Sequence, residues 1–237
     1  MSPPVGSGEA PTGTAFRAVV FDMDGLIIDS EPLWREAEKE IFGSIGVILT
    51  DEMCASTMGL RIDEVVAHWY RRFPWEGPAK EEVATRVVDR VISLVRQKGA
   101  ALPGVHTALQ NCRAVGLRTA LASSSARRII MAVLDRLGLI DEFEVIRSAQ
   151  DEPAGKPDPA IYLSAAAALR VRPNECLALE DSLNGVLAAK AAGMTCIAIP
   201  AASLAYPVGG PGADLTLASL EEISPQVLEE LAASRTR

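Results

Sequence analysis

Short apolar segments alternate along most of this chain with helical segments of crossover length. Patterns typical of buried strands lie at residues 17–21, 117–122, 143–147, 175–179, 194–199 and 213–216. Helical patterns at 126–137, 158–169 and 184–192 fill gaps between them. Because parallel strands need long crossover connections, this alternation is typical of a parallel sheet covered by helices on both faces. The sequence therefore predicts an α/β fold that binds its ligand at the carboxyl ends of the strands.

The segment between residues 31 and 99 interrupts this alternation. It carries helical patterns and no strand pattern, and apolar residues recur at steps of three and four between Val83 and Val95. Leu102-Pro103-Gly104 then marks the return to the sheet. We therefore expect a flexible tail at 1–15, a core formed by 16–30 and 100–237, and an inserted all-helical domain at 31–99.

Composition limits the classes of partner. With 237 residues, 49% of them hydrophobic, the chain can bury a full core. The net charge is −8 and no run of Lys or Arg exists, which argues against nucleic acid as a partner. The four cysteines have neither zinc-site nor disulfide spacing, and no secretory signal or membrane-spanning stretch is evident, so we expect a cytoplasmic protein. A monomer and a small homo-oligomer both remain open.

Two carboxylates follow the first predicted strand. Asp22 and Asp24 are two residues apart, and Gly25 permits the chain to turn sharply after them. Like charges at close range raise the pKa of one carboxyl group unless a cation or hydrogen bonds stabilise both. The pair therefore indicates a divalent metal, a division of labour between a nucleophile and a proton carrier, or both.

Polar groups also end three later strands or begin the helices after them. Ser123 and Ser124 open a helix, where hydroxyl and backbone N–H groups favour a phosphate oxygen, although such residues also simply cap helices. Lys156 lies in a constrained Gly-Lys-Pro loop and supplies the positive charge that the acidic site lacks. Glu180 and Asp181 form a second acidic pair, which points to Mg²⁺ with Asp181 as the first choice of ligand. Glu180 remains the alternative ligand.

In order and spacing, these four segments resemble the four motifs of the haloacid-dehalogenase (HAD) superfamily, specifically its aspartyl-phosphate phosphatases with a helical cap. The resemblance spans nearly all of residues 16–220. It implies a Rossmann-like parallel-sheet core with an inserted cap that closes over the site. Dehalogenases and phosphonatases of the superfamily lack a carboxylate at the position of Asp24, so phosphate ester chemistry is favoured.

The same resemblance implies a role for each motif residue. Asp22 corresponds to the nucleophile that forms an aspartyl-phosphate, and Asp24 to the acid that protonates the leaving oxygen and later activates water. Ser123 and Lys156 correspond to the pair that orients the phosphate. Asp181 corresponds to a Mg²⁺ ligand alongside Asp22 and the backbone carbonyl of Asp24.

The cap sequence is similar to the superfamily's sugar phosphatases, which act on 2-deoxyglucose 6-phosphate or hexitol phosphates. The similarity lies in Met58-Gly59-Leu60-Arg61-Ile62-Asp63 and in the stretch from His68 to Pro78. It implies a phosphorylated sugar or sugar alcohol as substrate. Arg61 is expected to contact a sugar hydroxyl or a phosphate, or else to form an ion pair on the cap surface.

Two rival functions share these motifs. One is a β-phosphoglucomutase-like isomerase, which must hold a second phosphate and protect its aspartyl-phosphate from water. The other is a non-catalytic protein that binds phosphosugars or acts as a scaffold, since a fold alone does not fix a function. The intact set of Asp22, Asp24, Lys156 and Asp181 favours catalysis.

Overall fold

The computed structural model of the chain describes residues 16–200 and 212–235. Its centre is a six-stranded sheet with the order β3-β2-β1-β4-β5-β6, in which every pairing is parallel. The strands are β1 (Ala18–Phe21), β2 (Arg118–Ser123), β3 (Val145–Ser148), β4 (Cys176–Glu180), β5 (Thr195–Ala198) and β6 (Leu215–Thr216). The prediction of an α/β fold with a parallel sheet is confirmed.

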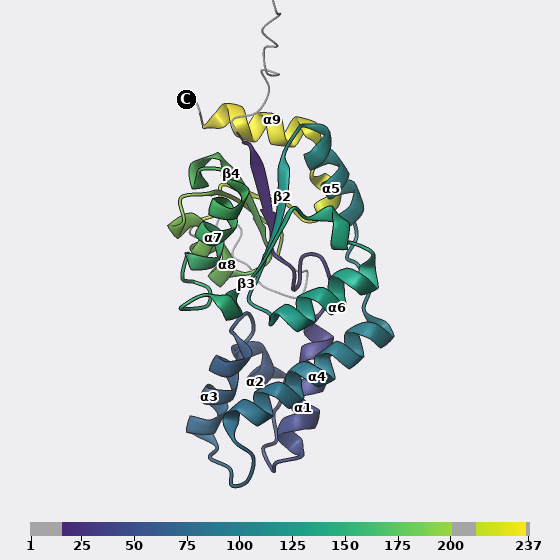
Figure 1. The fold of residues 1–237 in the computed structure, drawn as a ribbon, viewed down its shortest axis with the longest axis vertical. Helices are drawn as coiled ribbons and strands as arrows, with labels where there is room; N and C mark the ends of the chain where they lie inside the picture. The colour runs from purple at the N-terminus through teal and green to yellow at the C-terminus, as the bar shows by residue number, and fades with distance from the viewer. Residues whose placement is uncertain (1–15, 201–211, 236–237) are drawn as a thin grey trace, which may run out of the picture.

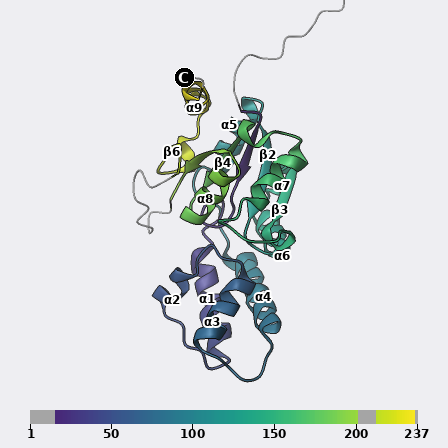
Figure 2. The same ribbon diagram turned by 90° about the vertical axis from the view of Figure 1, so that its left-hand side faces the viewer.

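Helices cover both faces of the sheet (Figures 1 and 2). The core helices are α5 (Val105–Ala114), α6 (Arg127–Leu137), α7 (Ala160–Leu169), α8 (Leu183–Ala191) and α9 (Pro225–Ser234). Small strand residues such as Ala18, Ala120 and Ala178 pack with the alanine-rich α7 and α8 on one face. Larger strand residues such as Phe21 and Leu121 share the other core with α5, α6 and α9. The alternation of side chains along each strand thus builds two separate cores.

The predicted strands and core helices agree with the structure to within a few residues. The largest shift at the start of a helix is in α7, which was expected to begin at Asp158 and begins at Ala160. The carboxylate of Asp158 instead accepts a hydrogen bond of 2.9 Å from the backbone N–H of Ala160. A short polar side chain that caps the turn before a helix therefore explains the difference.

The segment between β1 and β2 opens with four helices that form a cap beside the sheet (Figure 1). These are α1 (Glu31–Gly43), α2 (Asp51–Ser56), α3 (Ile62–Arg72) and α4 (Lys80–Lys98). Phe42, Trp69 and the valine stripe of α4 are buried at the centre of the cap. The predicted all-helical insertion is therefore present in the described residues.

The cap boundaries stay a proposal: we take residues 31–99 as the cap, and 16–30 with 100–237 as the core. The expected tail at 1–15 lies outside the described residues. None of the described helices combines the length and the apolar character that are needed to cross a membrane.

Candidate active site

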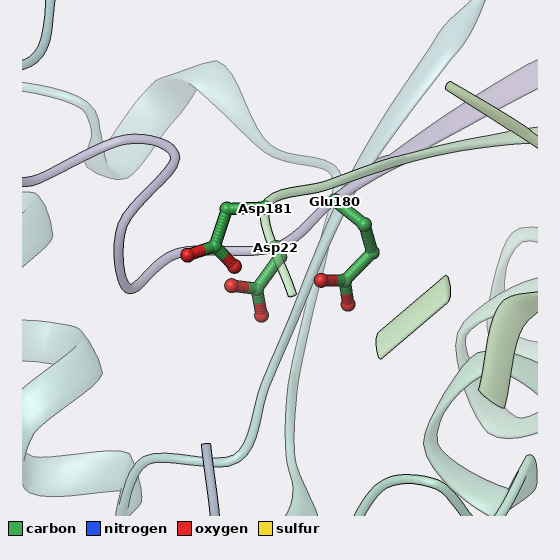
Figure 3. Close-up of side chains that lie close together, drawn as sticks. All are labelled: Asp22, Glu180 and Asp181. Carbon is green, nitrogen blue, oxygen red and sulfur yellow. The ribbon is translucent and has the colours of Figure 1, made fainter. Parts of the chain in front are cut away.

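Carboxylates from two neighbouring strands meet at the carboxyl edge of the sheet. Asp22 follows β1 directly, and Glu180 and Asp181 stand at the end of β4, which pairs with β1. All three side chains are buried. Figure 3 shows their carboxylate groups converging on one space, with Asp22 between the other two. One oxygen of each lies within 4.8 Å of the others, so together they could hold a metal ion.

Lys156 is the cation of this cluster. Its side chain is only 4% exposed, and its Nζ lies 2.5 Å from Oδ1 of Asp22 and 2.6 Å from Oε1 of Glu180. It also donates to the backbone carbonyl of Ala122 at 3.2 Å. Burial alone would lower the pKa of Lys156, but the adjacent carboxylates outweigh that effect and raise it. The lysine is therefore a fixed positive charge.

The two members of the second acidic pair have different surroundings. Glu180 accepts hydrogen bonds from Lys156, from the buried hydroxyl of Tyr162 and, at 3.3 Å, from the hydroxyl of Ser182. No donor among the described residues reaches the carboxylate of Asp181. Glu180 is therefore committed to positioning Lys156, while Asp181 keeps its oxygens available for a ligand.

Two glycines allow these acids to lie where they do. Gly25 has a φ of +77°, and a Cβ built on it would lie 2.0 Å from Oδ2 of Asp181. A Cβ on Gly185 in α8 would lie 1.9 Å from the carboxyl carbon of Glu180. A larger residue at either position would displace a carboxylate, because these distances fall far inside van der Waals range.

Electrostatics indicates that the acidic cluster fits a cation. Burial raises the pKa of Asp22 to about 8, with the charges of Glu180 and Asp24 adding to the effect and Lys156 opposing it. Burial, followed by the charges of Asp22 and Glu180, also raises the pKa of Asp181 well above its usual range. One lysine thus leaves the cluster with excess negative charge. Oxygen ligands of this kind suit Mg²⁺, and a bound divalent ion would lower these pKa values.

Asp24 lies at the junction of core and cap. Its Oδ1 accepts hydrogen bonds from the hydroxyl of Ser30 at 2.7 Å and the indole of Trp34 at 3.1 Å. Its Oδ2 accepts from the hydroxyls of Ser123 at 3.1 Å and Ser125 at 2.7 Å. Hydroxyl groups can rotate to donate or accept, so this network holds Asp24 in place while allowing its proton to be gained or lost.

A cavity of about 560 Å³ lies between the core and the cap and includes Asp22, Asp24, Lys156 and Asp181 in its lining. Ser124 also lines it, and its hydroxyl is buried without a hydrogen-bond partner among the described residues. The structure thus brings the four predicted acids and bases together with one free hydroxyl. Ser123, the other expected phosphate contact, donates to Asp24, and its contact with a phosphate stays a prediction.

Arg61 is placed differently from the other expected site residues. It stands at the start of α3, pairs with Asp63, and donates to the backbone carbonyls of Ala149 at 3.4 Å and Glu152 at 3.2 Å. It is not part of the cavity lining. Its guanidinium group therefore links the cap to the core in this arrangement, and a direct substrate contact stays a prediction.

Several residues of the site were not assigned to it from the sequence. Ser30 and Trp34 both hold Asp24, and their spacing of four at the start of α1 places them on one helix face. Ser125 lies in the same serine run as the predicted residues. Tyr162, by contrast, is one apolar-looking position in an alanine-rich helix, and nothing in the sequence marks it as a partner of Glu180.

The comparisons with known proteins agree with this site. Residues 16–193 match the family described as haloacid dehalogenase-like hydrolase. The chain belongs to this family. The sequence-based predictions of the superfamily and of a hydrolytic enzyme are therefore confirmed, and phosphatases among its relatives agree with the phosphoric monoester hydrolase class.

Individual relatives extend over nearly the whole chain. Hexitol phosphatase B of Escherichia coli strain K12 is 46% identical over 212 residues, covering 89% of this chain and 96% of that protein. Beta-phosphoglucomutase of Bacillus subtilis strain 168 is 30% identical over 223 residues, covering 90% and 94%. The structure of CbbY from Rhodobacter sphaeroides in complex with phosphate has a TM-score of 0.82 at 27% identity, covering 91% and 99%.

Proposed function

We propose that this protein is a Mg²⁺-dependent phosphatase that hydrolyses phosphate esters of small sugars or sugar alcohols through an aspartyl-phosphate on Asp22. The proposal rests mainly on the groups that lie close together in the core wall of the cavity. There Asp22 lies 2.5 Å from the fixed charge of Lys156. Beside it are the carboxylate of Asp181 and the hydroxyl of Ser124, neither of which has a hydrogen-bond partner within the described part of the chain. A nucleophile, a cation and ligands for a metal and a phosphate thus meet in one place.

In the first step, a carboxylate oxygen of Asp22 attacks phosphorus, and the bond between phosphorus and the ester oxygen breaks. The leaving alkoxide takes a proton from Asp24, because a sugar alkoxide is a poor leaving group without one. Lys156 and the hydroxyl of Ser124 orient the phosphoryl oxygens and offset their charge. Charge stabilisation and alignment are the main contributions to phosphoryl transfer.

In the second step, water attacks the phosphorus of the aspartyl-phosphate and gives its proton to Asp24. The bond between phosphorus and Asp22 breaks, and the carboxylate is regenerated. The covalent intermediate thus divides one difficult displacement into two easier ones. The hydrogen-bond network around Asp24 keeps this carboxyl group in place for both proton transfers.

Mg²⁺ would be held by the carboxylates of Asp22 and Asp181 with the backbone carbonyl of Asp24. When bound, it neutralises charge on the phosphoryl group and the nucleophile. Asp181 is preferred to Glu180 as the ligand because Glu180 already accepts from Lys156 and Tyr162.

The substrate class rests on the relatives and on the size of the cavity. A space of about 560 Å³ suits a small molecule, and the 46% identical relative is a hexitol phosphatase. We therefore propose phosphorylated hexoses, 2-deoxyglucose 6-phosphate or hexitol phosphates as substrates. A cytoplasmic location and a monomer or small homo-oligomer remain part of this proposal.

A phosphosugar mutase is the second candidate, since a β-phosphoglucomutase is 30% identical over most of the chain. A mutase would convert β-glucose 1-phosphate to glucose 6-phosphate in the presence of glucose 1,6-bisphosphate. NMR of that mixture separates the two candidates, because a phosphatase releases phosphate without isomerised sugar. Isomerisation faster than phosphate release would promote the mutase.

The direct test compares Asp22→Asn with the wild type in phosphate release from a panel of phosphorylated hexoses and hexitols with Mg²⁺. We expect the variant to lose activity by about 10⁴-fold or more while it keeps its fold, because an amide is nearly isosteric but a very poor nucleophile. Asp89→Asn is the matched control, since Asp89 lies on α4 and forms an exposed ion pair with Arg128 on α6. Near wild-type rates in Asp22→Asn would refute the mechanism. Absence of phosphate release by the wild type would instead favour the non-catalytic role.

A further inference from the structure

The cap contributes a buried acid to the cavity. Glu38 on α1 lines the space, is 6% exposed, and its Oε2 has no hydrogen-bond partner among the described residues. Burial raises its pKa to about 7, although a hydrogen bond with the thiol of Cys54 opposes the shift. A buried carboxyl group without a full set of partners is costly, so a purely structural role does not account for it.

The position of Glu38 relates it to the chemistry. It lies four residues after Trp34 on the same face of α1, and the indole of Trp34 donates to Asp24. Four residues advance a helix by about 6 Å. Glu38 therefore lies roughly one helical turn deeper in the cap than the residue that touches the proposed acid. A substrate whose phosphate rests at Asp22 would extend toward it.

The cavity has polar atoms without partners on both walls. On the core wall this atom is the hydroxyl of Ser124, which lies at the proposed phosphate site. On the cap wall the atoms are Oε2 of Glu38 and Nε of Arg35, neither of which has a hydrogen-bond partner among the described residues. The guanidinium group of Arg35 also forms ion pairs with Glu31 and, at 3.6 Å, with Asp51. The cap therefore offers an acceptor and a donor three residues apart on one helix. The rest of its wall is largely apolar, with Met58, Leu60 and Val65.

We propose that Glu38, with Arg35 beside it, binds hydroxyl groups on the substrate's carbon chain and thereby selects phosphorylated polyols and sugars over phosphorylated alkyl chains. This inference rests on the proposed phosphatase function and assigns the residue that selects its substrate. A hydroxyl group both donates and accepts, so it matches a carboxylate next to a guanidinium group. A substrate ammonium group would be drawn to Glu38 but repelled by Arg35.

The test compares two phosphate esters of equal carbon number, sorbitol 6-phosphate and hexyl phosphate. Their kcat/KM values are measured for the wild type, Glu38→Gln, Glu38→Leu and the matched control Glu40→Gln. Glu40 lies on the same helix, has a side chain that is 52% exposed, and pairs with Arg90 outside the cavity. Melting temperatures of all four proteins verify that each is folded.

We expect the wild type to prefer the polyol ester, and Glu38→Leu to reduce that preference by about 10- to 100-fold. Glu38→Gln keeps one acceptor oxygen and should lose less, while Glu40→Gln should keep the wild-type ratio. Because both changes at Glu38 remove a buried charge, unfolding is not the expected cause of the loss.

Three results would overturn the inference, and they can be told apart. An unchanged ratio in both Glu38 variants, with good wild-type turnover of sorbitol 6-phosphate, removes Glu38 from selection and leaves the proposed function standing. Absence of phosphate release from every ester by the wild type would refute both the proposed phosphatase function and the selecting role of Glu38. A wild-type preference for glucosamine 6-phosphate over glucose 6-phosphate that disappears in Glu38→Gln would mean that the carboxylate binds an ammonium group.

Discussion

The core wall and the cap wall of the cavity differ in how their polar groups are paired. On the core wall most charged groups hold one another in place, with Lys156 in contact with Asp22 and Glu180, and Glu180 in contact with Tyr162. Asp181 and the hydroxyl of Ser124, which have no hydrogen-bond partner among the described residues, stay available for a metal and a phosphate. The cap wall is largely apolar, and in residues 16–200 and 212–235 one oxygen of its buried carboxyl group at Glu38 finds no hydrogen-bond partner.

This difference separates catalysis from selection. A wall whose charges are fixed by one another holds its groups in one geometry, which phosphoryl transfer requires. A wall whose polar groups lack partners can instead form hydrogen bonds with the ligand. We therefore expect changes in the core to affect all substrates alike, and changes in the cap to alter the ranking of substrates.

The largest effect should come from removing the metal, which belongs to the core wall. EDTA should abolish phosphate release, Mg²⁺ should restore it, and Ca²⁺ should inhibit, because the larger ion takes more ligands and can bind a carboxylate in bidentate fashion. Asp181→Ala should raise the Mg²⁺ concentration for half-maximal activity by at least about tenfold. Asp89→Ala serves as the control. An unchanged titration in Asp181→Ala would move the ligand role to Glu180.

The second effect concerns the fixed charge of the core. Lys156→Met should lower kcat/KM by about 10² to 10³-fold for every ester tested, since it removes a donor to the phosphoryl oxygens. It should also destabilise the fold by about 3 to 5 kcal/mol, because Asp22 and Glu180 lose their buried counter-ion. Lys98→Met removes an exposed ion pair with Glu36 and should change neither kcat/KM nor the stability of the fold. A loss confined to one substrate would contradict the division between the walls.

The third effect is smaller because Tyr162 acts through its neighbours. Its hydroxyl donates to Glu180, which in turn holds Lys156. Tyr162→Phe should lower kcat by roughly tenfold, as one buried hydrogen bond to a charged group is lost. Its KM should change little, and all substrates should be affected equally. Tyr70→Phe, in the half-exposed aromatic cluster of the cap, provides the control.

The fourth effect concerns stability rather than activity, and it tests the cap acid without any substrate. Burial raises the pKa of Glu38 from 4.5 to about 7, so its contribution to stability is fully present below pH 4.5 and is lost as the pH rises to about 7. Between these limits the wild type should lose up to about 3 kcal/mol relative to Glu38→Gln. Melting temperatures measured across this range, with Glu40→Gln as control, test it. Parallel curves for the wild type and Glu38→Gln would show that Glu38 is not an unpaired buried acid.

The sequence predicted the core wall far better than the cap wall. Asp22, Lys156 and Asp181 stand next to strand ends or helix starts, and a parallel sheet brings such positions to one edge. The helical pattern between Val83 and Val95 predicted a buried face, and Val83, Val87 and Val91 are indeed buried in the cap. The same pattern carries no information about which buried polar residue lacks a partner, so Glu38 could be found only from the packed structure.

Tertiary contacts that the sequence does not show determine what Ser123 and Arg61 bind in the structure. Ser123 and Arg61 have the residue types expected for substrate contacts, but Ser123 donates to Asp24 and Arg61 to core carbonyls. Both contacts join segments that are far apart in the sequence. Local spacing therefore identifies the candidates, whereas only the assembled fold determines which groups they meet.

We expect the chemistry to take place on Asp22 in the core wall. The most direct measurement uses Asp24→Asn with p-nitrophenyl phosphate and Mg²⁺, quenched in acid and analysed by peptide mass spectrometry. p-Nitrophenolate leaves without needing a proton, whereas breakdown of the intermediate needs Asp24 as a base, so phosphoenzyme should accumulate. We predict that phosphate is found on the peptide that contains Asp22. Phosphate on another residue, or nitrophenol release with no labelled protein, would contradict the account.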